Sequence, residues 1–233
     1  MIAIITSCIR PIENTNDPKS HFSVKERENQ TIFTLEKLSA LNFKKIIVVD
    51  NSVSYDFNEL ELRFKHIKFI SIKQFQFENK GINELLMLLA EVDELPENTP
   101  IFKISGRYYP NEDFNINFNE AYDFKVKAYN FDTKRGSIST RAYFVKNKQI
   151  YKNFLLKTFI ETFTYSHKIV GIRSFIYQLK RIFIKNLPTS ISTSIEFAAA
   201  RVLKNENYKV EFVNKIGVEG QIAGFKELSK IKE

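Results

Sequence analysis

The chain has no tryptophan, and its 233 residues include one cysteine, Cys8. A single cysteine excludes an internal disulfide, which fits a reducing cytoplasm. The three histidines, His21, His66 and His167, lack metal-ligand spacing, so a structural zinc site is not expected. The sequence also lacks GxGxxG, P-loop and HExxH patterns. Dinucleotide, Walker-type and zincin functions therefore have no motif support.

Long apolar runs are absent as well. No run reaches the roughly 18 residues that span a bilayer, and no basic segment precedes an apolar signal-like stretch. We therefore expect a soluble or peripheral cytoplasmic protein. A chain of this length can bury a core without disulfides or metals, and 22 Phe and 10 Tyr supply the bulk.

Positive charge is abundant and unevenly distributed. The net charge is +8, and residues 134–187 hold twelve Lys or Arg but one acid, Glu161. The whole positive excess therefore lies in this segment. Such asymmetry indicates an anionic partner, whether a membrane surface, a phosphorylated ligand or a nucleic acid.

The first half of the chain alternates between strand and helix patterns. Apolar runs predict buried strands, and a capping box at Ser23 and a helical stripe after Gly81 predict helices between them. This order is typical of a parallel α/β sheet. The predicted strands are 1–5, 46–49, 67–72 and 101–105.

The second half is less regular, and we expect it to complete the same domain. The division we predict is an α/β core over 1–147 and a basic, helical part over 148–233. The predicted strands here are 124–129, 137–145 and 210–213, and the predicted helices are 150–163, 172–185 and 194–203.

The strand that ends at Gly106 is the first candidate site. Glycine lets the backbone approach a ligand closely, and the guanidinium of Arg107 suits phosphate or carboxylate. The Pro-Asn pair at 110–111 is predicted to turn the chain. Ligands of open α/β sheets bind outside the carboxyl ends of the strands. The alternative is an edge turn in which Arg107 pairs with Glu112 or Asp113.

The predicted helix 172–185 is amphipathic, with Phe175 in its apolar stripe and no acid on its polar side. It could lie on an anionic membrane leaflet, or pack on the core with a solvated basic face. The uneven charge favours the membrane. The basic side chains on the polar side are Arg173, Lys180, Arg181 and Lys185.

Several short segments together resemble GT-A glycosyltransferases. The strand 46–49 with the following Asp-Asn-Ser resembles the second-strand signature of that fold, and Asn-Lys-Gly at 79–81 resembles its Asn-x-Gly pattern. The strand 101–105 falls where the superfamily carries an Asp-x-Asp metal motif. In order and spacing these segments resemble bacterial sugar transferases from surface-polysaccharide clusters. The resemblance covers 2–114, and later mainly the Ser-Ile-Glu at 194–196 and the region of Gly217 and Gly220.

This resemblance implies a nucleotide-diphospho-sugar transferase fold with a Rossmann-type, mostly parallel sheet flanked by helices. In this fold residues 1–147 would bind the nucleotide-sugar, and residues 148–233 would face the acceptor or the membrane. It implies a glycosyltransferase that moves a sugar from a nucleotide-sugar donor to a lipid-linked glycan, as in O-antigen, capsule or lipopolysaccharide biosynthesis. Such an enzyme would work at the inner face of the cytoplasmic membrane. No nucleic-acid partner is expected.

The resemblance also implies positions for the donor. Asp50 would accept hydrogen bonds from the base or ribose, although a turn-former bonding its own backbone is the alternative. Taken alone, Lys80 is a solvated surface lysine. The donor-binding residues implied are Thr6, Ser7, Arg10, Asp50, Asn51, Ser52, Lys80, Gly81, Lys103, Gly106 and Tyr108.

One departure from the GT-A pattern concerns the metal. A Gly-Arg-Tyr sequence replaces Asp-x-Asp, and an Arg or Lys clamp can stabilise a leaving phosphate as a metal does. We therefore predict transfer without a required cofactor, with Arg107, helped by Lys103 or Arg10, in place of the cation. The alternative is a Mn²⁺ or Mg²⁺ ion held by Glu112 and Asp113.

Glu196 is the first candidate for the base that takes the proton of the acceptor hydroxyl. It begins a helix, where the dipole keeps a carboxylate ionised, and this suits a structural cap equally well. Glu84 is the second candidate. Two other functions stay open: a nucleotidyltransferase, which normally needs a metal, and a non-catalytic anion- or nucleic-acid-binding module that uses residues 134–187.

Overall fold

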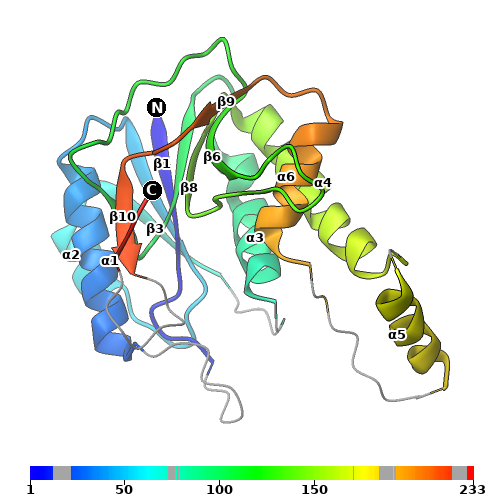
Figure 1. The fold of residues 1–233 in the computed structure, drawn as a ribbon. Helices are drawn as coiled ribbons and strands as arrows, with labels where there is room; N and C mark the ends of the chain where they lie inside the picture. Colours follow the sequence, from blue (N-terminus) through cyan, green and yellow to red (C-terminus); the bar gives the residue numbers. More distant parts are fainter. Residues whose placement is uncertain are drawn as a thin grey trace.

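The computed structural model describes residues 1–12, 22–72, 77, 79–169, 171–183, 191, 193–221 and 230–233. Within these ranges an eight-stranded sheet forms the centre, and helices cover both of its faces (Figure 1). The predicted α/β class, with a mostly parallel sheet flanked by helices, is confirmed.

Four parallel strands form one half of the sheet. They lie in the order β3-β2-β1-β4. All residues of β1 are buried, as are the last five of β2. A strand buried on both faces needs a continuous apolar run, which is the pattern that predicted it. Their bounds are β1 (Ile2–Ser7), β2 (Lys45–Asp50), β3 (Ile67–Ser71) and β4 (Ile101–Ser105).

The other half of the sheet is mixed. β8 (Ala142–Val145) runs antiparallel to β4, and β6 (Phe124–Tyr129) runs antiparallel to β8. β7 (Ser137–Ile138) and β9 (Val210–Val213) pair with β6. Residues 148–233 therefore contribute a strand to the sheet of the first half.

The helices pack on the two faces and form two cores. On one face, α1 (Val24–Ser39) and α2 (Asn58–Arg63) bury leucines against β1 and β2. The other face carries a second apolar cluster (Figure 1). Its helices are α3 (Lys80–Glu91), the short η1 (Val92–Glu94), α4 (Lys148–Ser166) and α6 (Ile195–Asn205).

A small antiparallel sheet was not predicted. It consists of β5 (Tyr108–Pro110), β10 (Val218–Gln221) and β11 (Lys230–Lys232), in the order β11-β10-β5. The predicted turn at 110–111 is therefore wrong in part, because Pro110 still pairs with Val218. A proline is tolerated at such an edge position.

The predicted strand 137–145 is also wrong in part, because it divides into β7 and β8. The break allows the carbonyl of Thr140 to accept a hydrogen bond from the buried Lys103. The local sequence pattern that predicted one continuous strand contains no information about this contact.

One helix, α5 (Ile172–Phe183), extends away from the body of the molecule (Figure 1). None of the helices in the described ranges has the length and apolar content needed to span a bilayer.

Candidate functional site

The ends of three neighbouring strands meet at one edge of the sheet. Ser7 pairs with Asp50, and Thr6 pairs with Ser105. The amide of Gly106 donates to the carbonyl of Thr6 at 2.8 Å. A Cβ at position 106 would lie 3.2 Å from that carbonyl oxygen, so glycine permits the close approach. The polar residues predicted at the strand ends are thus brought together.

Asp50 has the turn-forming role that the sequence left as the alternative. It is fully buried, and its two carboxylate oxygens accept the amides of Ile9 at 3.3 Å and Ser52 at 2.6 Å. In turn, the Ser52 hydroxyl accepts the amide of Arg10, whose guanidinium donates to the Ser54 carbonyl. The contact of Asp50 with a base or ribose stays a prediction.

Asn51, also implied as donor-binding, is buried beside them, and its Oδ1 has no hydrogen-bond partner. Buried polar atoms are normally paired. An unpaired acceptor at the carboxyl edge of β2 is therefore compatible with a ligand that donates to it.

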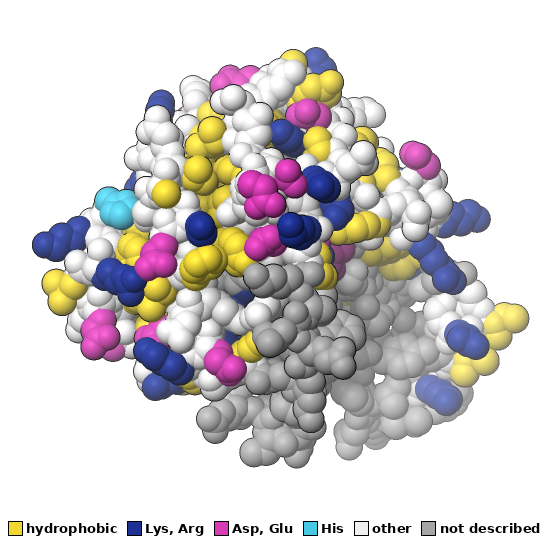
Figure 2. Space-filling model, turned by 60° about the vertical axis from the view of Figure 1, so that its left-hand side comes forward, with side chains coloured by type: hydrophobic (Ala, Val, Ile, Leu, Met, Phe, Trp, Pro, Cys, Tyr) yellow, Lys and Arg dark blue, Asp and Glu magenta, His cyan; other side chains and the backbone are white. Residues whose placement is uncertain are grey.

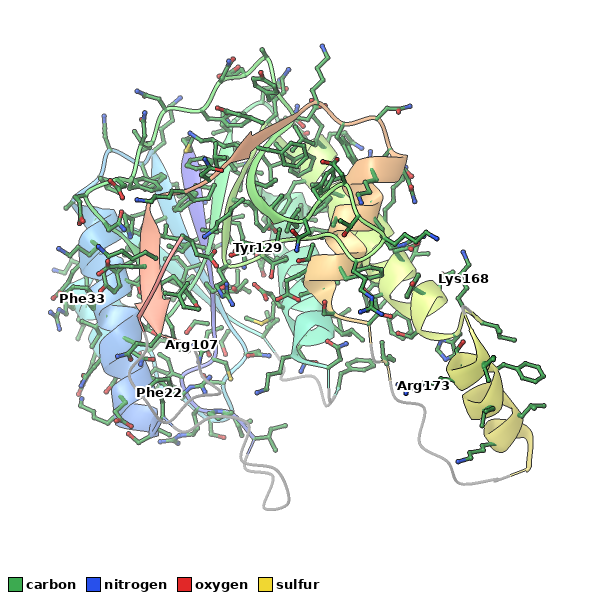
Figure 3. All side chains as sticks on the ribbon, in the orientation of Figure 1. Phe22, Phe33, Arg107, Tyr129, Lys168 and Arg173 are labelled. Carbon is green, nitrogen blue, oxygen red and sulfur yellow. The ribbon has the colours of Figure 1, made fainter. Side chains whose placement is uncertain are left out.

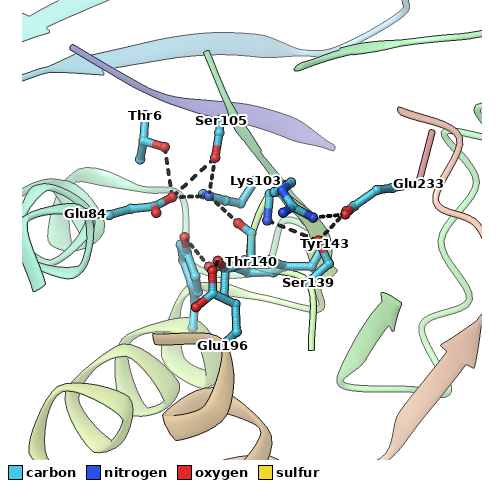
Figure 4. A network of polar contacts seen from close by, with 11 residues as sticks. Thr6, Glu84, Lys103, Ser105, Ser139, Thr140, Tyr143, Glu196 and Glu233 are labelled. Atoms are coloured by element: carbon cyan, nitrogen blue, oxygen red, sulfur yellow. Dashed lines mark hydrogen bonds and ion pairs between the residues drawn. The ribbon is translucent and has the colours of Figure 1, made fainter. Parts of the chain in front are cut away.

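A buried ion pair joins β4 to α3. Lys103 is fully buried and pairs with Glu84, whose side chain is 21% exposed (Figure 4). The Lys103 ammonium also donates to Ser105 Oγ at 3.0 Å. Glu84 Oε1 accepts from Thr6 Oγ1 at 3.0 Å. The Lys103 ammonium therefore already contacts three acceptors, counting the Thr140 carbonyl, and its role beside Arg107 stays a prediction.

A pocket of about 390 Å³ lies next to this pair, where α3 and α6 begin. Its volume is at the lower end of the range for small-molecule sites. The two candidate catalytic carboxylates, Glu84 and Glu196, both line it. The other lining residues are Asn79, Lys80, Gly81, Ser194 and Ile195.

Gly81 determines how closely the two helices approach. A Cβ at this position would lie 2.7 Å from Cβ of Ile195, a distance that real side chains do not tolerate. Asn79 caps α3 by accepting the Gly81 amide at 2.9 Å, and its Nδ2 donates to the Thr193 carbonyl at 2.8 Å. Gly81 was predicted to lie beside a ligand. The structure adds a packing reason for glycine.

A second pocket, of about 320 Å³, shares Ser194 and Glu196 with the first. Hydroxyl-bearing side chains dominate its wall. The sequence did not point to the other lining residues, because β7 and the segment between β7 and β8 carry no distinctive motif. They are Tyr129, Ser137, Ile138, Ser139, Thr140 and Arg141.

The two carboxylates differ in what already binds them. All hydrogen bonds described for Glu84 end on Oε1, which also pairs with Lys103. Glu196 accepts one long hydrogen bond, 3.5 Å from Thr140 Oγ1. A general base needs lone pairs within reach of the proton that it removes. Glu196, which faces both pockets, meets this requirement better than Glu84.

Arg107 does not form the edge-turn ion pair considered as the alternative. Glu112 and Asp113 lie 3.5 and 3.4 Å from Lys232 and Lys215 instead. Burial lowers the pKa of the Arg107 guanidinium, and the charge of Arg27 lowers this pKa further. Nη1 of Arg107 is buried and has no hydrogen-bond partner.

Tyr108, predicted to bind the donor, is buried under Arg141, whose guanidinium lies 5.7 Å from the ring centroid. Arg141 pairs with the buried carboxylate of Glu233, which also accepts from Ser139 and from Tyr129 at 2.9 Å. This cluster supports the wall of the second pocket.

Among the described residues, no three His, Cys, Asp or Glu side chains are gathered as a metal site would require. The carboxylates named as alternative metal ligands, Glu112 and Asp113, lie in exposed positions beside lysines.

The apolar side chains described on α5 are exposed rather than packed on the core. Ile172 is 79% and Phe175 48% exposed. Lys168 and Arg173 project into solvent at the start of the helix (Figure 3). Lys180 is exposed as well, whereas Lys185 and the side chain of Arg181 lie outside the described residues. Elsewhere, on the face in Figure 2, acidic and basic side chains are interspersed.

No protein-family model matches the sequence, and no curated protein is similar to it. Similar solved structures include a CTP:phosphocholine cytidylyltransferase from Streptococcus pneumoniae, with 11% identity over 94% of this chain and 92% of that one, at a TM-score of 0.48. A nucleoside-diphosphate-sugar pyrophosphorylase from Vibrio cholerae has 8% identity, 94% coverage of both chains and a TM-score of 0.47. A galactosyltransferase has 6% identity, 91% and 73% coverage and a TM-score of 0.46.

We predict that Lys103 and Glu84 are energetically coupled. Lys103→Met should destabilise the protein by about 3 kcal/mol, because removing one partner leaves the other charge uncompensated. The double variant with Glu84→Gln should lose less than the sum of the single variants, by about 1–3 kcal/mol. Urea unfolding of all four proteins measures this. Additive losses would show that the pair does not act as a unit.

We also predict that Gly81→Ala lowers stability by about 1–3 kcal/mol, because the new methyl group overlaps Ile195. Gly171→Ala is the matched control, since a Cβ there would have open space. Thermal unfolding compares the two variants. Equal midpoints for both would contradict the close approach of α3 and α6.

Proposed function

We propose that this protein is a glycosyltransferase that moves a sugar from a nucleotide-sugar donor to a glycan acceptor. The observation that supports it best is the pair of adjoining pockets that share Glu196 at the carboxyl edge of the sheet. Two adjoining pockets can hold a donor and an acceptor side by side, and Glu196 at their boundary is placed to take the proton of the acceptor hydroxyl. The GT-A resemblance of the strand-end segments favours the same reaction.

In this proposal the donor sugar occupies the pocket at the start of α3, and the acceptor occupies the hydroxyl-lined pocket. The acceptor hydroxyl oxygen attacks the anomeric carbon, and its proton passes to Glu196. The bond from the anomeric carbon to the phosphate oxygen breaks, and the nucleoside diphosphate leaves with the electron pair. The half-buried Arg107 stabilises the charge that develops on this leaving group.

The first test is turnover of a panel of nucleotide sugars, followed by replacement of the base. Glu196→Gln should lower the transfer rate about 100-fold or more, because general-base catalysis contributes this much. Nucleotide binding, measured by thermal shift, should persist in the variant. Thr140→Val, which removes the hydroxyl that contacts Glu196, serves as the milder comparison.

Two results would contradict this assignment. Unchanged turnover in Glu196→Gln would show that Glu196 is not the general base. If activity disappears in chelator and returns only with Mn²⁺ or Mg²⁺, the transfer needs a metal ion and Arg107 does not replace it.

We further propose that α5 places the enzyme on an anionic membrane, where a lipid-linked acceptor would be found. The support is an exposed apolar face next to exposed basic side chains, on a helix that extends from the body. Apolar burial at the acyl boundary together with attraction to anionic headgroups is how such helices bind. The excess of basic residues over 134–187 adds to this attraction.

Liposome flotation tests the membrane surface. The intact protein should float with vesicles that contain anionic lipid and should stay unbound with neutral ones. Phe175→Ser should reduce the floating fraction severalfold, whereas Leu62→Ser, at a 71% exposed apolar position on α2, should leave it unchanged. Equal flotation with neutral and anionic vesicles, or equal losses in both variants, would contradict the role of α5.

A nucleotidyltransferase of sugar activation is the second candidate. The specific observation in its favour is the unpaired guanidinium nitrogen of Arg107 near a second arginine, which suits a nucleoside triphosphate as well as a nucleotide sugar. Incubation with a nucleoside triphosphate and a sugar phosphate distinguishes the two functions, because only a nucleotidyltransferase would release pyrophosphate from this pair. A module that only binds anions would consume neither pair of substrates.

A further inference from the structure

Two arginines from different elements reach the carboxyl end of β1. Arg107 follows Gly106, whose amide is hydrogen-bonded to the Thr6 carbonyl at 2.8 Å. Arg27 lies in the second turn of α1, and its Nε donates to the Cys8 carbonyl at 2.7 Å. The backbone just before Arg107 and the guanidinium of Arg27 are therefore held by carbonyls two residues apart, at Thr6 and Cys8. Figure 3 shows Arg107 in the region between α1 and β1.

This arrangement is electrostatically unfavourable in the free protein. Burial and the charge of Arg27 both lower the pKa of Arg107. Glu84 is the carboxylate whose charge opposes this effect, yet it already pairs with Lys103. The Nη1 atom of Arg107 is buried without a partner. A buried cation that is not fully compensated costs stability, and natural proteins accept such costs chiefly at functional sites.

We propose that Arg27 and Arg107 form one binding site for the diphosphate of the donor, an inference that rests on the proposed function and identifies Arg27 as a further binding residue. A single carboxylate would satisfy one planar guanidinium, whereas a diphosphate offers a charged group to each. Glu84 interacts with Arg107 and also lines the first pocket. The diphosphate would therefore lie beside the pocket assigned to the sugar.

Calorimetric titration of the full chain with inorganic pyrophosphate tests the site without turnover. Arg27→Gln and Arg107→Met should each weaken binding at least about tenfold, because each removes a charge-assisted contact. Arg27→Lys, which keeps the charge but loses the planar fork, should give an intermediate loss. The matched control is Arg135→Gln, an exposed arginine of the basic segment, which should change the affinity less than about twofold.

Thermal unfolding without ligand gives an independent readout. Arg107→Met should leave the midpoint unchanged or raise it by a few degrees, because it removes a charge that burial and Arg27 both disfavour. A large fall in the midpoint would instead show that Arg107 has a structural role. Wild-type pyrophosphate affinity in both Arg27 variants would overturn the two-arginine site.

The outcomes for the site and for the reaction are separable. If pyrophosphate binds as expected but no nucleotide sugar is consumed, the anion site stands and the glycosyltransferase assignment fails. If sugar transfer occurs while Arg27→Gln binds pyrophosphate as the wild type does, the reaction stands and the inference about Arg27 fails.

Discussion

The ion pair between Lys103 and Glu84 is the interaction on which the rest of the site depends. A lysine inside a sheet can stay charged only if an acid and further acceptors surround it. The carboxylate of α3, the Ser105 hydroxyl and the Thr140 carbonyl supply them. These contacts join α3, β4 and the segment between β7 and β8. The wall of the first pocket and the break between β7 and β8 are therefore parts of one network.

This network also assigns different roles to side chains of the same type. Glu84 compensates a buried cation and holds Thr6, whereas Glu196 faces two pockets and accepts a single long hydrogen bond. Lys103 is enclosed, while Arg107 keeps a buried nitrogen without a partner. The residues with satisfied contacts maintain the architecture. The residues whose polar atoms lack partners can still form hydrogen bonds with a ligand. Both groups of residues lie at one edge of the sheet.

The basic segment shows a similar division. Arg141 pairs with Glu233, Lys157 pairs with Glu206, and Lys152 and Lys148 pair with Asp93 and Glu97. The exposed cations of α5 lie instead beside exposed apolar side chains, on a helix separated from the body. Within the basic segment, the surface of α5 is therefore the one for which we propose a membrane partner.

The sequence by itself determined the α/β class, the four parallel strands and the meeting of their polar ends, because buried parallel strands read as apolar runs and their carboxyl ends share one edge. It also indicated Glu84, Glu196 and Arg107 as chemically important. Only the tertiary structure decided that Asp50 forms a turn, that Lys103 faces Glu84, and that Arg27 and Arg141 belong near the site. Each of these depends on which distant partner occupies the adjacent space, and local periodicity carries no record of such contacts. The small sheet of β5, β10 and β11 was missed for the same reason, since a strand of three or four residues owes its conformation to its pairing partner.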